Sequence, residues 1–243
     1  MITVGIASMD RPAWAFVESL WQLQAPEGEA LRITRQGPLA VDVARNEVVR
    51  AFLQQESDWL LMVDADATLH PKTLLRLLSW NQPVVGALCF QRYGPCMPTV
   101  MRGQVNDTAD SLNALYGTQV GEIREWVLAH PMMVQSGPVL LDPAPEDALT
   151  PVDRTGCHCL LIHRQVLEAI PDPWFVGNPK RRHTQEDMTF CDAVRAAGFP
   201  IYVDRSVVAA HLYGDRALGA LDFIVWDSVS DYGDQPEPAV NQR

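Results

Sequence analysis

Asp64 and Asp66, two carboxylates one residue apart, directly follow a short apolar run. The run from Trp59 to Val63 carries no charge, and Pro71 comes five residues after the pair. An unbroken short apolar run is typical of a strand buried on both faces, and Pro favours the first turn of a helix. The two aspartates are therefore expected where a central strand ends, at the edge of an α/β sheet where ligands bind.

Carboxylate oxygens at such an edge suit a hard divalent cation, which takes its remaining ligands from water and a phosphate. A D-x-D pair alone is a weak signal, because aspartate is also common after strands as a cap of turns and helices. The position of Asp64 and Asp66 after a buried strand, together with partners much later in the chain, favours the metal hypothesis.

Those later partners are an acidic pair and a histidine. Glu186 and Asp187 fall in the first turn of a helix predicted from Thr184 to Gly198, with Thr184 and Asp187 spaced as in a capping box. Acids there complement the helix dipole, which is the simpler interpretation of the pair taken alone. The functional alternative is a catalytic base or a hydrogen-bond acceptor for substrate. His211 follows the last predicted strand, where a single histidine is more often a surface residue.

An alternating pattern of strands and helices positions these residues and predicts an α/β fold. Strands are expected over 2–7, 31–34, 59–63, 83–90, in the second half of 151–162, and over 201–204 and 207–210; helices are expected over 14–23, 38–54, 72–78, 164–170 and 184–198. The 95–150 region is irregular and reads as an elaboration over the sheet edge. Within it, Trp126 and His130 could line a pocket or simply pack in the core.

In the helix over 38–54, apolar residues recur at helical spacing at positions 41, 44, 48 and 52. Asp42, Arg45 and Asn46 are then expected on or near the opposite face in the first turns. The first interpretation of these three is a solvated helix face. Pro171 to Phe175 is expected to form a rigid turn that carries two exposed aromatic rings, one of them Trp174.

The bulk composition narrows the function classes. Thirty acidic against nineteen basic residues give a net charge of -11, which argues against broad binding to nucleic acid or anionic membrane. Five scattered cysteines do not form a disulfide framework. The chain has no signal-peptide pattern, no membrane-spanning apolar run and no Gly-rich phosphate loop, so a cytoplasmic location is expected.

Taken in order, these segments resemble a nucleotide-sugar glycosyltransferase of the GT-A fold, close to glycosyltransferase family 2. The matching segments are ARNEVVRAFL (44–53), WLLMVDADATLHP (59–71), VDRTGCHCLLIHRQVLEAI (152–170) and EDMTFCDAVRAAGFPIYVDRSVVAAHL (186–212). The resemblance implies a Rossmann-like α/β fold with a mostly parallel central sheet flanked by helices. It implies one domain over 1–226, in which 95–150 is an acceptor-side elaboration, and a flexible acidic tail over 227–243.

The resemblance also implies roles. Asp66 would bind Mn²⁺ or Mg²⁺, Asp64 the metal or the ribose, and His211 would complete the metal site. Asp187 would be the general base that deprotonates an acceptor hydroxyl, and Glu186 would orient acceptor or sugar. The implied nucleotide-binding residues are Ala7, Ser8, Arg11, Asp42, Arg45, Asn46, Asp64 and Ala65. The implied donor-sugar and acceptor residues are Arg92, Gly156, Cys157, His158 and Trp174.

The expected donor is a UDP- or GDP-sugar, and the acceptor is open: a glycan, a protein, a small molecule or a modified DNA base, the last with the basic cluster at 180–182 as a phosphate contact. The chain lacks the QxxRW-type signature of processive synthases, which favours single addition. A retaining relative would share the metal site without the base.

Three alternatives stay open. Asp64 to Thr68 fits the DxDxT nucleophile motif of haloacid-dehalogenase-like phosphatases, although Gly219 stands where their second late aspartate is expected. A sugar-nucleotide pyrophosphorylase would share the sheet but open with a Gly-rich loop that is missing here. A catalytically inactive GT-A module would only bind a glycan or a partner.

Overall fold

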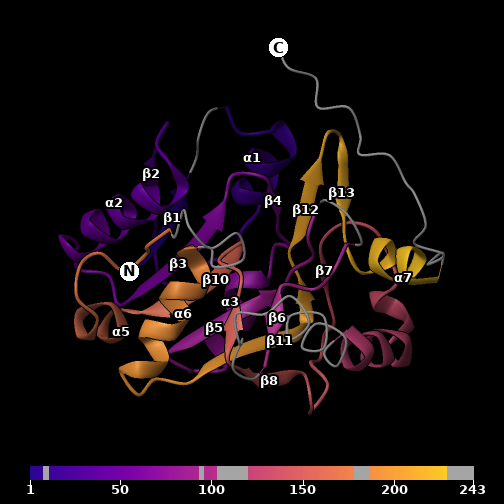
Figure 1. Ribbon diagram of the computed structural model, residues 1–243. Helices are drawn as coiled ribbons and strands as arrows, with labels where there is room; N and C mark the ends of the chain where they lie inside the picture. Colours follow the sequence, from indigo (N-terminus) through magenta and orange to yellow (C-terminus); the bar gives the residue numbers. More distant parts are fainter. Residues whose placement is uncertain (8–10, 93–95, 103–119, 178–185, 229–243) are drawn as a thin grey trace.

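The computed structural model describes residues 1–7, 11–92, 96–102, 120–177 and 186–228. Its central feature is one mixed sheet with helices on both faces (Figure 1). Within the described residues, no helix has the length and apolar character needed to cross a membrane.

Eight strands form the central sheet, in the order β2-β1-β3-β10-β5-β11-β7, with β8 also paired to β11. They are β1 (Ile2–Ala7), β2 (Leu31–Gln36), β3 (Trp59–Asp64), β5 (Val84–Leu88), β7 (Val139–Leu140), β8 (Leu149–Val152), β10 (Cys159–His163) and β11 (Ile201–Val208). The β1 strand pairs in parallel with β2 and β3, and β5 pairs in parallel with β11. Only β10, β7 and β8 run the other way, so the expectation of a mostly parallel sheet is confirmed.

The apolar run before Asp64 is buried on both faces, as its pattern predicts. In β3, Leu60 and Met62 belong to one hydrophobic cluster, whereas Leu61 and Val63 belong to the other. The first cluster includes residues of α2 (Val41–Leu53), α5 (Arg164–Ala169), α6 (Glu186–Ala196) and α7 (Ala220–Ser228). The second includes residues of α1 (Trp14–Trp21) and α3 (Thr73–Ser79). The two clusters therefore fill the two sides of the sheet.

Two small sheets connect distant segments at one end of the central sheet. The hairpin of β12 (Ala210–Tyr213) and β13 (Arg216–Leu218) pairs through β12 with β4 (Ala67–Thr68), which sets His211 opposite Ala67. Figure 1 shows this hairpin beside β4. The pair of β6 (Val100–Met101) and β9 (Arg154–Thr155) places Thr99 beside Gly156, whose N–H donates to the Thr99 carbonyl at 3.1 Å.

The prediction of two strands over 201–210 is wrong, because β11 continues through Arg205 and Ser206 with only an irregular register near Val208. The polar pair remains in the strand because its groups are bonded: Ser206 donates to Asp204 Oδ1, and Arg205 donates to the carbonyl of Asp147 at 2.5 Å.

The described part of the 95–150 region contains a helix over 120–129 and a 3₁₀ turn (Pro131–Met133), with Trp126 in the core. The domain limits remain a prediction.

Candidate functional site

An open cleft of about 690 Å³ lies at the carboxyl ends of the parallel strands. Its lining comes from seven segments: the start of α2, the end of β3, the residues after β5, the residues around β6, the residues between β9 and β10, the start of α6, and β12. Because β10 is antiparallel to β3 and β5, its amino end reaches the same edge and brings His158 into the cleft. The lining residues are Val41, Arg45, Asp64, Asp66, Cys89, Phe90, Gln91, Arg92, Thr99, Met101, Gly156, Cys157, His158, Glu186, Asp187, Met188 and His211.

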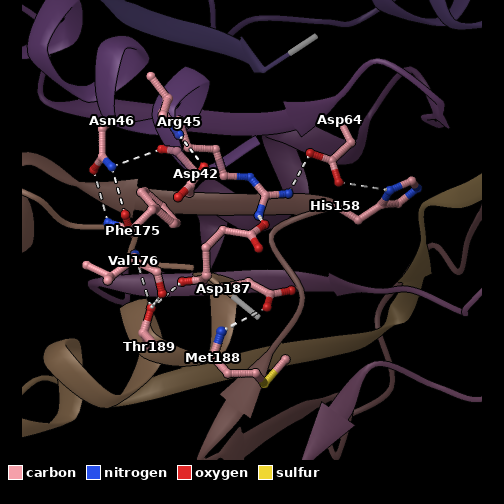
Figure 2. Close-up of polar contacts among 12 residues, drawn as sticks. Asp42, Arg45, Asn46, Asp64, His158, Phe175, Val176, Asp187, Met188 and Thr189 are labelled. Atoms are coloured by element: carbon pink, nitrogen blue, oxygen red, sulfur yellow. Dashed lines mark hydrogen bonds and ion pairs between the residues drawn. The ribbon is translucent and has the colours of Figure 1, made fainter. Parts of the chain in front are cut away.

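Arg45 links three elements inside this cleft (Figure 2). Its Nη2 donates to Asp64 Oδ1 at 2.7 Å, and its Nη1 donates to Glu186 Oε1. The expectation of a solvated face is wrong for Arg45, which is 3% exposed, and for Asn46, which is 6% exposed. The buried positions of α2 include 45, 48, 49 and 52, so Arg45 continues the stripe that faces the sheet.

The Arg45 ion pairs set the charge state of this end of the cleft. Burial disfavours the charged guanidinium, but the carboxylates around it, Asp64 above all, outweigh that effect and raise the pKa of Arg45. Burial likewise disfavours ionised Asp64, whereas Arg45 and His158 outweigh it and hold the pKa of Asp64 well below its usual range. Asp64 and Arg45 are therefore both charged at neutral pH.

Asp66, His158 and His211 offer ligand atoms that all lie within 4.8 Å of one another. His211 Nε2 lies 3.2 Å from Asp66 Oδ2, and His158 Nδ1 lies 3.8 Å from Asp66 Oδ1. Burial disfavours the ionised form of Asp66, but the two neighbouring imidazoles lower its pKa. Asp64 lies beside this group, with its Oδ2 3.5 Å from His158 Nδ1 (Figure 2), rather than within it.

Arg92 also reaches Asp66, and its Nη1 donates to Asp66 Oδ2 at 2.5 Å. The guanidinium therefore shares one carboxylate oxygen with His211. A cation at this place and Arg92 would compete for Asp66.

Asp187 also lines the cleft, from the first turn of α6. Its Oδ1 accepts the Met188 N–H at 2.8 Å (Figure 2), and a Cβ built on Gly156 would lie 3.6 Å from its Oδ2. Burial, only partly offset by Arg45, raises the pKa of Asp187 to about 6. Glu186 is tied to Arg45, so Asp187 is the carboxylate of the pair better suited to exchange a proton.

Several predicted site residues lie outside the cleft lining. Asn46 holds the chain after α5, because its side chain bonds both the N–H and the carbonyl of Phe175 (Figure 2). Trp174 is buried in the core, where its Nε1 donates to the Leu167 carbonyl, so the expectation of exposed rings at Trp174 and Phe175 is wrong. Both rings pack against apolar side chains of the first hydrophobic cluster. Their burial there is more favourable than exposure to water in a polar turn.

Four more of the predicted nucleotide-binding residues also lie outside the cleft lining. Ala7 ends β1 beside Asp64 and is buried, Arg11 is exposed, and Asp42 accepts the Val43 N–H. Ala65, between the two aspartates, packs against the smaller cluster. Ser8, Thr184 and the basic cluster at 180–182 lie outside the described residues.

Sequence reasoning missed Thr99, Met101, Cys89 and Gln91 as cleft residues. Gln91 and Cys89 follow the apolar run of β5, and their place at a strand end is a signal that could have found them. Thr99 and Met101 carry no such signal, because only the pairing of β6 with β9 brings them to the site.

No family model and no curated protein matches this chain. Among solved structures, it is similar to A197 from STIV with a TM-score of 0.57 and 17% identity, over 90% of each chain. It is also similar to S. aureus TarS 1–349, with a TM-score of 0.44 and 14% identity, over 86% of this chain and 60% of that one. A structure of that fragment in complex with UDP-GlcNAc has a TM-score of 0.43 and 14% identity, over 88% of this chain and 60% of that one.

The sheet order and its flanking helices, with the likeness to A197 over 90% of each chain, define the fold. The chain has the GT-A fold of nucleotide-sugar glycosyltransferases.

Proposed function

We propose that this protein is a metal-dependent glycosyltransferase that moves a sugar from a nucleotide-diphosphate sugar to an acceptor hydroxyl. One observation carries the proposal: a single cleft is lined both by a candidate metal group and by a buried carboxylate with a raised pKa. Such a cleft can hold a diphosphate and an acceptor hydroxyl at opposite ends of one sugar. The GT-A fold supports the same class of reaction.

The residues fit a divalent cation. His158 Nδ1 is buried and has no hydrogen-bond partner, although Asp64 and Asp66 oxygens lie within 3.8 Å. When bound, Mn²⁺ or Mg²⁺ acts as a Lewis acid that offsets the charge developing on the diphosphate leaving group. Asp66, His211 and His158 would hold the ion, while Asp64, fixed by Arg45, remains available to a ribose or to the ion's water.

Asp187 supplies the base in this proposal. The acceptor O–H gives its proton to Asp187 as the oxygen attacks the anomeric carbon. The bond from that carbon to the diphosphate breaks, and the nucleoside diphosphate leaves with the bonding electrons. Attack from the side opposite the diphosphate inverts the anomeric centre. Glu186, held by Arg45, would orient acceptor or sugar.

A thermal-shift screen tests the donor site. UDP-, GDP-, CMP- and dTDP-sugars, UDP-GlcNAc among them, are each added with Mn²⁺ and with EDTA. A ligand that binds only the folded state raises the melting temperature. We therefore expect the sugars of one nucleotide to raise the melting temperature with Mn²⁺ but not with EDTA. No shift with any donor would favour an inactive module and overturn the proposal.

The Asp66→Ala variant tests whether the metal-dependent shift comes from the proposed metal site. Because it removes the carboxylate shared by both imidazoles, we expect it to abolish the metal-dependent shift while the protein stays folded. Asp142→Ala, an exposed carboxylate paired with Lys72, is the control and should leave the shift unchanged. An undiminished shift in Asp66→Ala would contradict a metal site at Asp66.

Two alternative activities have distinct signatures. A pyrophosphorylase would form a nucleotide-sugar from a nucleoside triphosphate and a sugar phosphate. A haloacid-dehalogenase-like phosphatase would release phosphate from aryl phosphates in a way that Asp64→Asn abolishes. The ion pair between Asp64 and buried Arg45 disfavours the phosphatase, since it lowers the nucleophilicity of that carboxylate.

For the donor we keep a UDP- or GDP-sugar as the proposal. For the acceptor, the proposed classes remain a glycan, a protein, a small molecule or a modified DNA base. Product analysis with the donor found in the screen would decide among them.

A further inference from the structure

Two tryptophans of α1 point away from the core. Trp14 is 71% exposed and Trp21 is 82% exposed, whereas Phe16, on the inner side of the helix, is 2% exposed and belongs to the second hydrophobic cluster. Tryptophan is highly buried on average in folded proteins. Because α1 is held to the sheet by its inner side, the fold itself gives no reason for two exposed indole rings.

The two indole rings lie on one face of the helix, about two turns apart. Residues seven positions apart share a face, and the helical rise separates their backbones by about 10 Å. Glu18 and Gln22 are exposed on the same side. The α1 face, which comprises Trp14, Glu18, Trp21 and Gln22, therefore consists of two separate aromatic rings with a carboxylate and an amide beside them.

This arrangement matches the chemistry of a sugar chain. A pyranose ring has a face of C–H groups, which stacks on an indole, and an edge of hydroxyl groups, which bond carboxylate and amide side chains. A short oligosaccharide spans two indoles about 10 Å apart, the separation set by the helical rise. The carboxylate of Glu18 is then placed to accept hydrogen bonds from the sugar hydroxyls between the two rings.

The charge of the α1 face favours a neutral partner. Over Trp14–Trp21 the helix contains one acidic residue, Glu18, and no lysine or arginine, and the chain carries a net charge of -11. Helices that lie on membranes surround their aromatic residues with basic side chains. Protein-binding hot spots are compact and fully desolvated, whereas polar residues separate the two indoles here. A neutral glycan complements both the charge and the spacing of the face.

The α1 helix also lies close to the candidate metal group. It packs against β4, which directly follows Asp66 and pairs with β12, the strand of His211. Figure 1 shows α1 at the same end of the central sheet as the β12–β13 hairpin. A glycan bound to the α1 face therefore stays near the cleft.

We propose that the α1 face binds a neutral oligosaccharide and holds a glycan acceptor beside the cleft. The inference rests on the proposed function and selects the glycan from its acceptor classes. Holding a long acceptor at a second place raises the concentration of its reacting end at the cleft. Loss of the α1 face should therefore raise KM for long acceptors and leave kcat and the KM of short acceptors unchanged.

The first test measures binding without donor and in EDTA, so that it does not depend on the metal site. Neutral oligosaccharides of glucose, mannose and N-acetylglucosamine are titrated into the whole protein by calorimetry. We expect the wild type to bind at least one of them. Trp14→Leu and Trp21→Leu should each weaken that binding by about tenfold or more, because leucine is apolar but offers no flat ring. Trp21→Phe keeps a ring and should retain most of the affinity.

Met132→Ala is the matched control, because Met132 is 72% exposed and lies on the 3₁₀ turn and not on α1. It should bind the oligosaccharide as the wild type does. The altered side chains are all exposed, so the melting temperatures of the variants should equal that of the wild type.

The outcomes separate this inference from the proposed function. If donors bind with Mn²⁺ but no oligosaccharide binds, or if the leucine variants bind as tightly as the wild type, the inference fails and the proposed function stands. If Trp21→Glu instead abolishes binding to phosphatidylcholine vesicles or dissociates a dimer in sedimentation, the face belongs to a membrane or to a second copy, and the inference fails. Oligosaccharide binding that the leucine variants lose, in protein that binds no donor, supports the glycan site and contradicts the transferase.

Discussion

At the scale of single residues, the proposed role of Asp187 as general base can be tested most directly. We expect Asp187→Asn to retain metal-dependent donor binding but lose transfer by roughly 10²–10⁴-fold, the usual effect of removing a general base. In the wild type, kcat/KM should rise with pH and level off above about pH 6, since the base must be ionised. Asp192→Asn, on the same helix but paired with Arg154, is the control and should leave turnover unchanged. Normal transfer by the Asp187 variant would remove Asp187 from the mechanism.

The raised pKa of Asp187 predicts that the stability of the protein depends on pH. Folding raises the pKa of Asp187 from near 4 to about 6, so folding favours its protonated form. Its contribution to stability is therefore full below about pH 4 and is lost as pH rises through about 6. The loss is at most about 3 kcal/mol, at about 1.4 kcal/mol per pKa unit. The melting temperature of Asp187→Asn relative to wild type should increase between pH 4 and pH 6.5 and then stay constant; a difference independent of pH would contradict this burial effect.

At the scale of elements, Arg45 joins α2 to the end of β3 and to the start of α6. Removing one partner of a buried ion pair leaves an uncompensated charge, which typically costs about 3–5 kcal/mol. We expect Arg45→Met to lower the free energy of unfolding by about that amount in urea titrations. It should also raise the pKa of Asp187 further, because Arg45 now lowers it.

Arg50→Met, one and a half turns along α2, is the matched control. Its partners Glu47 and Asp172 are exposed, and exposed pairs contribute little. Equal destabilisation by the two variants would mean that the Arg45 effect comes from lost helix packing and not from the buried charges.

At the scale of the whole molecule, charge opposes the proposed donor. The chain carries a net charge of -11, and four carboxylates in the cleft face the guanidinium groups of Arg45 and Arg92. The net charge therefore repels an anionic nucleotide-sugar on approach, even when one divalent cation is bound. We expect the association rate constant, measured by stopped flow with saturating Mn²⁺, to rise between about 20 mM and 200 mM NaCl, because salt screens the repulsion. A steep fall with salt would reveal a local positive potential stronger than the net charge.

The sequence by itself determined most strands of the central sheet, the helices beside them and the strand-end position of Asp64 and Asp66, because apolar runs and helical periodicity are local properties. It also determined that Glu186 and Asp187 begin a helix. Only the tertiary structure decided that β12 pairs with β4 and brings His211 to Asp66, that antiparallel β10 delivers His158 to the same edge, and that Arg45 is buried. Trp174 packs in the core for the same reason. Strand pairing and burial depend on segments far apart in the sequence, and no local pattern in either segment encodes its partner.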